Sequence, residues 1–143
     1  MNILFVCTGN TCRSPMAEAI AAKFLSEQGI SAECSSAGIY AVPGQALSEN
    51  SQKALEIGFG IRDFSHKAIP LTGEMLRSAD LVVAMTENHK ALIRQAFGES
   101  NKVIAMPREI GDPFGGDLPR YLACAHAIFQ GVKALHEEGF FRD

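Results

Sequence analysis

The residues best suited to chemistry stand near the start of the chain, in the sequence Cys7-Thr8-Gly9-Asn10-Thr11-Cys12-Arg13-Ser14. This segment follows the apolar run 2–6 and precedes a helical pattern, which indicates a loop between a strand and a helix. Backbone N–H groups in such a loop can bind an anion, and the helix N-terminus strengthens the site. Arg13 adds paired N–H donors that suit two phosphate oxygens. The same positive field favours the thiolate of Cys7. The pattern predicts phosphoryl transfer to the Cys7 sulfur.

Asp112 is the best candidate for the acid that this reaction needs. A thiolate that attacks a phosphoryl group needs an acid to protonate the departing atom, and then a base to activate water against the phosphocysteine. Pro113 disfavours helical backbone at Asp112 and can hold its carboxyl at the edge of a loop. Many Asp-Pro turns have no function, but beside a phosphate loop the catalytic interpretation is favoured. Asp117, in the same segment, is better explained as the N-cap of the next helix.

Short apolar runs alternate with helical patterns along the chain. This order predicts one doubly wound α/β domain over residues 1–143, with a four-stranded parallel sheet flanked by helices on both faces. The expected strands are 2–6, 31–35, 81–85 and 102–105. The expected helices are 15–28 with Pro15 first, 48–57, 87–97 and 118–138. The expected core stripe of the last helix is Leu122, His126, Phe129, Val132 and Leu135. Ligands of such sheets bind at the carboxyl ends of strands, where Cys7 would lie.

Composition and charge exclude several function classes. The chain is 47% hydrophobic and 20% charged, as in ordinary globular proteins, and its net charge of −3 offers no basic face for nucleic acid or an anionic membrane. No apolar run is long enough to span a membrane, and the N-terminal apolar stretch has no basic leader. We therefore expect a cytoplasmic monomer that binds neither nucleic acid nor membrane.

The four cysteines are expected to be free thiols in a reducing compartment: Cys7, Cys12, Cys34 and Cys124. There is no Cys-x-x-Cys pair, and the histidines show no ligand spacing, so we expect no metal and no cofactor. Cys12 lies in the same tight loop as Cys7. Two interpretations of it stay open: a reversible Cys7–Cys12 disulfide that protects the nucleophile, or a small residue packed under the loop.

Segments in order along the chain resemble the low-molecular-weight protein tyrosine phosphatase family: Val6-Cys7-x5-Arg13-Ser14-Pro15, Ser36-Ala37-Gly38, Asp80-Leu81-Val82 and Asp112-Pro113. The resemblance covers almost the whole chain and implies a flavodoxin-like fold and phosphorylated protein substrates. It implies that Cys7 is the nucleophile, Arg13 the phosphate-binding arginine, and Asp112 the general acid and then base. It also implies that Ser14 donates a hydrogen bond to the Cys7 thiolate, while Asn10 and Ser36 support the loop. From the residues alone, Ser14 could instead cap the helix, and Asn10 could be present because it tolerates left-handed backbone.

Thr11 bears on which phosphorylated side chain is the substrate. Tyrosine-specific members of the family usually carry isoleucine or another bulky aliphatic residue at this point. Their acid loop usually reads Asp-Pro-Tyr-Tyr-Gly, whereas this chain has Asp-Pro-Phe-Gly-Gly at 112–116. Both features resemble the bacterial protein-arginine-phosphatase branch. A small Thr11 leaves room beside the phosphate, and its hydroxyl can orient a guanidinium group or a water. We expect phosphoarginine as the substrate, with phosphotyrosine as the alternative.

Three other functional classes fit the residues less well than a phosphatase. An arsenate reductase on the same fold needs resolving cysteines after the third strand, and residues 86–98 contain none. A protein that only binds phosphate would need neither the thiolate of Cys7 nor the acid Asp112. A phosphotransferase of the sugar-transport type would not need Asp112. The residues present therefore favour hydrolysis.

Overall fold

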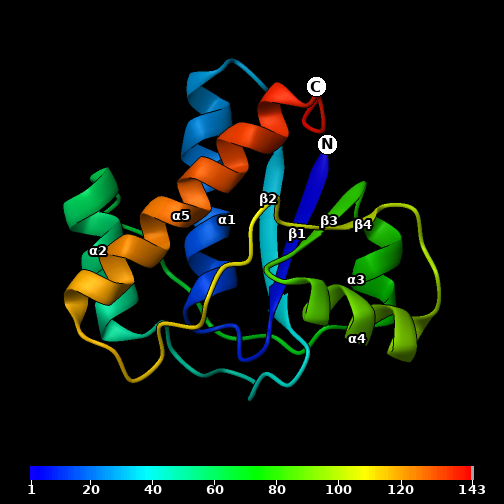
Figure 1. Ribbon diagram of the computed structural model, residues 1–143, viewed down its shortest axis with the longest axis horizontal. Helices are drawn as coiled ribbons and strands as arrows, with labels where there is room; N and C mark the ends of the chain where they lie inside the picture. Colours follow the sequence, from blue (N-terminus) through cyan, green and yellow to red (C-terminus); the bar gives the residue numbers. More distant parts are fainter. Residues whose placement is uncertain (143) are drawn as a thin grey trace.

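Four parallel strands and five helices make up the computed structural model, which describes residues 1–142 (Figure 1). Asp143 lies outside the described residues. The strands are β1 (Asn2–Cys7), β2 (Glu33–Gly38), β3 (Leu81–Ala84) and β4 (Val103–Ala105), in the order β2-β1-β3-β4. The helices are α1 (Arg13–Glu27), α2 (Glu49–Phe59), α3 (Gly73–Ser78), α4 (Glu87–Phe97) and α5 (Leu118–Glu137). This confirms the predicted α/β fold.

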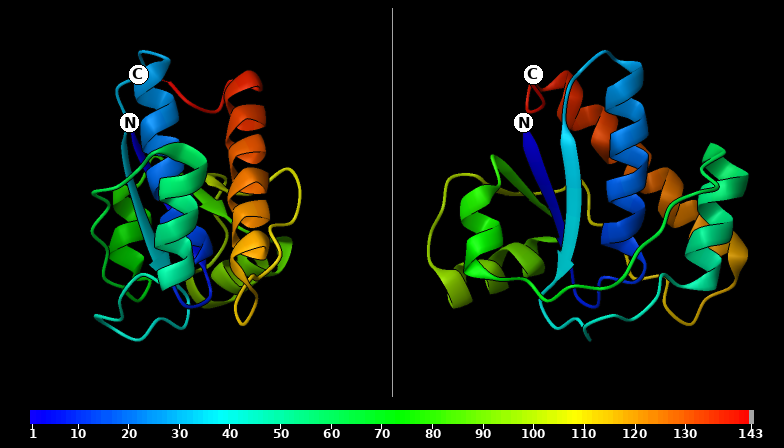
Figure 2. Two further views of the ribbon diagram at one scale, coloured as in Figure 1. Left: turned by 90° about the vertical axis from the view of Figure 1, so that its left-hand side faces the viewer. Right: turned by 180° about the vertical axis from the view of Figure 1, so that it is seen from behind.

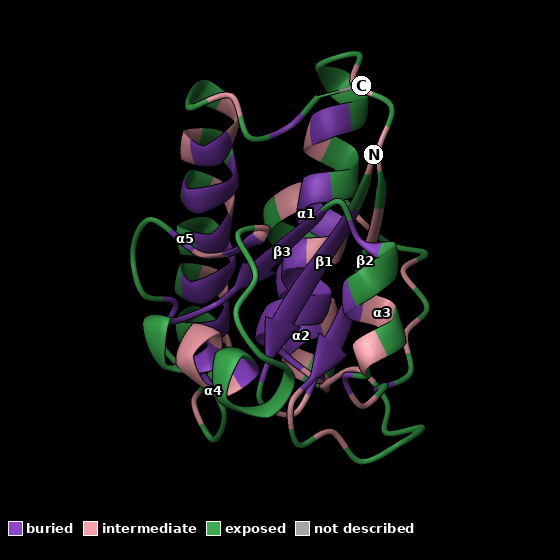
Figure 3. Ribbon diagram, turned by 90° about the vertical axis from the view of Figure 1, so that its right-hand side faces the viewer, coloured by how far each residue is buried: buried purple, intermediate pink, exposed green. Residues whose placement is uncertain are grey.

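The central strand β1 divides the core into two layers. Ile3 and Phe5 belong to the apolar cluster that also contains residues of α1 and α5, whereas Leu4 and Val6 belong to the cluster with residues of α3 and α4. The helix pair α1 and α5 therefore covers one face of the sheet, and α3 and α4 cover the other (Figure 2). In Figure 3 the strands are mostly buried and the outer faces of the helices are exposed. Within residues 1–142, none of the helices is long and apolar enough to cross a membrane.

The sheet changes its winding direction at β1. From β1 the chain crosses to β2 on one side, and β3 pairs with the other side of β1. In an open parallel sheet, the carboxyl ends of the strands beside such a point form the ligand-binding crevice. Cys7 ends β1, so the fold places it at this crevice.

Several element boundaries differ from those predicted, most clearly those of α1 and β2. Helix α1 begins at Arg13, so Pro15 is its third residue rather than its first. Proline is tolerated there because N–H groups in the first turn have no partner within the helix. Strand β2 runs over Glu33–Gly38 rather than 31–35, since its parallel pairing with β1 continues to the Cys7–Gly38 pair. The short helix α3 was not located from the sequence; the Thr72 hydroxyl, which accepts from the Met75 N–H at 3.2 Å, begins it.

The predicted core stripe of α5 was wrong at one of its five positions, His126, which is exposed. Val132 and Leu135 are buried, and Leu122 and Phe129 are half-buried and pack against the core. The residues of α5 that are buried are Tyr121, Cys124, Ala125, Ile128, Gly131, Val132 and Leu135. Because α5 packs against both α1 and α2, its apolar face is broad, and periodicity alone did not separate the centre of that face from its flank.

Candidate active site

The segment 8–12 leaves β1 at the carboxyl edge of the sheet and returns directly into α1. In Figure 1 this loop and the loop after β2 lie at the same, lower end of the sheet. The described structure thus brings the predicted residues Cys7, Arg13 and Ser36 to one edge, although Ser36 is far along the chain. Asp112 reaches the same place from the loop after β4, since its carboxylate lies 3.8 Å from the Arg13 guanidinium.

The Cys7 sulfur is buried and is contacted by a hydroxyl. The Oγ of Ser14 lies 2.9 Å from the Cys7 Sγ. This Oγ accepts a hydrogen bond from the Asn10 side-chain amide at 2.8 Å, and its hydroxyl proton has two acceptors in reach, the Cys7 sulfur and the more distant Ala37 carbonyl oxygen at 3.4 Å. A thiolate can only accept such a bond, and the bond stabilises its charge. Ser14 does not cap α1, because the N-cap residue is Cys12.

Asn10 connects the loop to β2 from behind. It is fully buried, and its φ of 58° lies in the left-handed region. Both explanations given for Asn10 therefore hold: it adopts left-handed backbone, and its side chain supports the loop. Its side-chain amide donates to the Ser36 Oγ at 3.0 Å, and its side-chain Oδ1 accepts from the Ile69 N–H at 3.0 Å. Its backbone carbonyl oxygen lies 2.7 Å from the His66 Nε2. Ser36 in turn donates to Glu18, whose carboxyl pKa is raised by burial. These contacts hold the backbone of the loop in one conformation.

The Arg13 guanidinium joins three segments at the mouth of the loop. Its side chain is 8% exposed. Nη1 donates to the backbone carbonyl of Ile110 at 3.1 Å, and Nη2 donates to the Thr8 Oγ1 at 3.5 Å. The carboxylate of Asp112 lies 3.8 Å from Nη2. The guanidinium is therefore held between the segments that carry Thr8, Ile110 and Asp112.

Asp112 is held by its own turn. Its Oδ1 accepts the N–H of Phe114 at 3.0 Å across Pro113, while its side chain stays 56% exposed. Such a carboxylate can exchange protons with water and still keep its position. Asp117 is the N-cap of α5, accepting from the Arg120 N–H at 3.2 Å, as predicted.

Thr11 and Cys12 occupy different depths of the loop. Thr11 is half-buried, whereas Cys12 is buried. The Cys12 Sγ lies 3.5 Å from the Ser48 Oγ and 3.6 Å from the Tyr121 Oη. All four cysteines are free, so the packing of Cys12 is observed and its disulfide with Cys7 stays a prediction.

Two histidines that sequence reasoning left without a role contact the loop. His66 lies beside the Asn10 carbonyl, and the Nε2 of His89 lies 2.8 Å from the Thr8 Oγ1. Burial, together with the Arg13 charge, lowers the pKa of His89 from 6.5 to about 4, so its imidazole is neutral at physiological pH. The sequence held one weak signal that His89 has a structural role: it stands three residues after Thr86, at the start of a helix.

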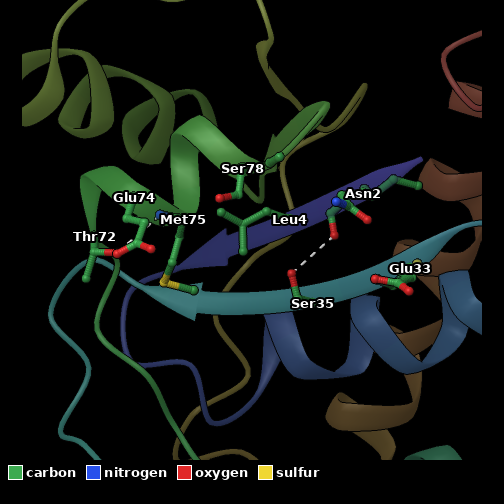
Figure 4. Close-up of a pocket in the computed structure, with 11 residues that line it drawn as sticks. Asn2, Leu4, Glu33, Ser35, Thr72, Glu74, Met75 and Ser78 are labelled. Carbon is green, nitrogen blue, oxygen red and sulfur yellow. Dashed lines mark hydrogen bonds between the residues drawn. The ribbon is translucent and has the colours of Figure 1, made fainter.

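A separate pocket lies along β1 and β2, against α3 (Figure 4). Its volume is about 380 Å³, and Asn2, Leu4, Glu33 and Met75 are among its lining residues. It holds none of the predicted site residues. Within residues 1–142 there is also no group of three or more histidine, cysteine or acidic side chains placed to hold a metal ion.

Comparison with known proteins agrees with this geometry. The model of the family described as low molecular weight phosphotyrosine protein phosphatase matches residues 2–139. The chain belongs to this family. It is a cysteine-based phosphoprotein phosphatase, and the predicted resemblance is confirmed.

Relatives of this phosphatase are named for two different substrates, phosphoarginine and phosphotyrosine in proteins. A protein-arginine-phosphatase of Bacillus subtilis is 40% identical over 130 residues, which are 85% of each chain. The low molecular weight protein-tyrosine-phosphatase PtpB of Staphylococcus epidermidis is 36% identical over 146 residues, covering 96% of this chain and 100% of that one. A solved structure of the YwlE arginine phosphatase, a mutant whose active-site serine is phosphorylated, superposes with a TM-score of 0.90 at 36% identity and covers 96% of this chain and 95% of that chain.

Proposed function

We propose that this phosphatase hydrolyses phosphoarginine in proteins, with Cys7 as the nucleophile and Asp112 as the acid and then the base. The observation that carries the substrate choice is the half-buried Thr11 in the loop, where a larger aliphatic side chain would fill the space beside the phosphate. The name of the Bacillus subtilis relative supports the same choice. Phosphotyrosine is the alternative, and the Staphylococcus relative supports it.

In the first step, the Cys7 sulfur attacks phosphorus and the bond from phosphorus to the guanidine nitrogen breaks. Backbone N–H groups of residues 8–13 and the Arg13 guanidinium hold the phosphoryl oxygens while charge develops on them. Asp112 protonates the departing nitrogen, so the arginine side chain leaves as its guanidinium cation and Asp112 is left ionised. The Arg13–Asp112 contact of 3.8 Å keeps the acid beside the phosphate site.

In the second step, water attacks the phosphocysteine and the sulfur–phosphorus bond breaks. Asp112, now ionised, takes a proton from the water, and inorganic phosphate leaves with the thiolate restored. Ser14 stabilises that thiolate as a leaving group through its hydroxyl, 2.9 Å away. Asn10 and Ser36 act by holding the loop in the conformation that binds phosphate. The phosphorylated active-site serine of the YwlE mutant supports a covalent step at this place in the fold.

Replacing Thr11 by isoleucine tests the substrate choice. We expect the native enzyme to prefer a phosphoarginine peptide over the matched phosphotyrosine peptide in kcat/KM. Thr11→Ile should move this ratio toward phosphotyrosine by about tenfold or more, because a hydroxyl contact is lost and the space is filled. Thr11→Ser is the control, since it keeps the hydroxyl and should keep the preference. A native preference for phosphotyrosine, or a ratio that Thr11→Ile leaves unchanged, would contradict the proposal.

Cys12 gives a second prediction, on oxidation. We propose that peroxide converts Cys7 to its sulfenic acid and that the Cys12 thiol then displaces water to form a reversible disulfide. Thiols should restore activity to the oxidised native enzyme but not to Cys12→Ser, measured as recovered kcat. Cys124→Ser is the matched control, because burial raises the pKa of the Cys124 thiol to about 12 and keeps it unreactive. Full recovery of activity by oxidised Cys12→Ser would contradict the proposed disulfide.

We further infer that residues 1–143 act as one phosphatase domain, a monomer in the cytoplasm. The four free thiols support a reducing compartment, and every residue named in the two steps comes from this one chain. Sedimentation of the purified protein at assay concentration tests the monomer.

A further inference from the structure

Three side chains connect helix α4 to the phosphate loop and take no part in the steps above. The Nε2 of His89 lies 2.8 Å from the Thr8 Oγ1, and its Nδ1 lies 3.0 Å from the Thr86 Oγ1. His89 is 3% exposed and Thr86 is 9% exposed, whereas Thr8 is exposed at the site. A buried imidazole thus bridges a buried hydroxyl and a hydroxyl that faces solvent.

The neutral imidazole has one N–H, and the hydroxyl of Thr86 decides which nitrogen carries it. The Thr86 Oγ1 accepts the backbone N–H of His89 at 3.1 Å, as the N-cap of α4. If Nδ1 carried the proton, Thr86 would accept twice and its own buried O–H would lack an acceptor in the described part of the chain. An unpaired buried donor is costly. With the proton on Nε2, Thr86 donates to Nδ1, and the buried polar groups of the His89 and Thr86 side chains are all paired.

The Nε2–H tautomer leaves the proton of the Thr8 hydroxyl unused. A hydroxyl oxygen has two acceptor positions and one donor. Nε2–H of His89 takes one acceptor position, and the Arg13 Nη2 at 3.5 Å takes the other. The hydroxyl proton of Thr8 then has no remaining partner among residues 1–142, and Thr8 directly follows the nucleophile in the loop.

We propose that Thr8 is a substrate-contacting residue whose hydroxyl donates to a phosphoryl oxygen, and that His89 is the positioning residue that orients it. His89 stays neutral because it is buried and faces the Arg13 guanidinium; Asp112 and Glu109 also face it and oppose this effect. A neutral imidazole adds no second cation beside Arg13. The inference rests on the proposed phosphate site but not on the choice between phosphoarginine and phosphotyrosine.

A double-mutant cycle read by inorganic phosphate affinity tests the coupling. We expect Thr8→Val to weaken phosphate binding and raise KM by about tenfold, because one hydrogen bond to a charged group is lost. His89→Phe should weaken binding to a similar degree, and the Thr8→Val/His89→Phe protein should be no weaker than Thr8→Val alone. His89→Gln should restore most of the affinity, since its amide N–H can replace Nε2–H.

Several outcomes would overturn the proposal. Additive losses in the double variant would show that His89 acts only on packing. Thr8 is exposed, and Thr8→Val changes little volume, so the variant is expected to fold, which circular dichroism checks; unchanged phosphate affinity in the folded variant rejects the substrate contact directly. In the native enzyme, ¹⁵N shifts of the His89 ring that place the proton on Nδ1 would reject the tautomer. If phosphate fails to bind the native loop at all, the proposed function itself fails; if it binds and Thr8→Val changes nothing, only the present proposal fails.

Discussion

Cys7→Ser is expected to lower kcat by about 10⁴-fold or more on both phosphoarginine and phosphotyrosine peptides. A serine hydroxyl is a weak nucleophile without a neighbouring base, and no histidine contacts the Cys7 sulfur among the hydrogen bonds of the described residues. The substitution changes little volume, so the loop should keep its shape. The measurement is kcat, with phosphate affinity followed in parallel.

The control for Cys7→Ser is Cys124→Ser, which replaces another buried thiol outside the loop and should leave kcat within about twofold. Retained phosphate binding with lost turnover would separate catalysis from simple phosphate binding. Turnover within tenfold of the native value in Cys7→Ser would contradict a nucleophilic role for this sulfur.

Asp112→Asn is expected to lower kcat by about 10² to 10³-fold, the usual contribution of a positioned general acid or base. The amide keeps the shape of the side chain and its acceptor for the Phe114 N–H, but it cannot give or take a proton at neutral pH. Phosphate affinity should change little, because Arg13 keeps its contacts to Ile110 and Thr8.

Asp117→Asn is the matched control for Asp112→Asn. It makes the same chemical change in the same loop, and asparagine caps a helix as well as aspartate does, so α5 and kcat should both be preserved. Equal kcat in the native enzyme and Asp112→Asn would favour a phosphotransferase over a hydrolase.

The parts predicted best from the sequence were those determined by neighbouring residues. The loop between Cys7 and Ser14 is contained in eight consecutive positions, and its strand and helix are signalled on either side. The N-cap at Asp117 and the buried strand 81–84 were likewise predictable, because the residues that signal them are adjacent in the sequence. The structure brings Ser36 and Asp112 to the loop, as the family resemblance implied.

The parts that sequence reasoning missed depend on packing between distant segments. The contact of Thr8 with His89 joins residues 81 positions apart, and that of Asn10 with His66 joins residues 56 apart. No spacing rule links such pairs, because the crossover helices decide which side chains meet. The misassigned flank of α5 has the same cause, since contact with both α1 and α2 determines which of its apolar residues are central.

The central claim, hydrolysis in two steps through Cys7 and Asp112, is tested most directly by trapping the intermediate. Asp112→Asn is mixed with a phosphoarginine peptide, quenched within one turnover, digested, and examined by mass spectrometry. Because the second step lacks its base, the account predicts a phosphoryl group on the Cys7 sulfur, in the peptide that contains residues 7–13, and none in Cys7→Ser/Asp112→Asn. Release of phosphate with no phosphoryl group on Cys7, or its appearance on another residue, would contradict the account.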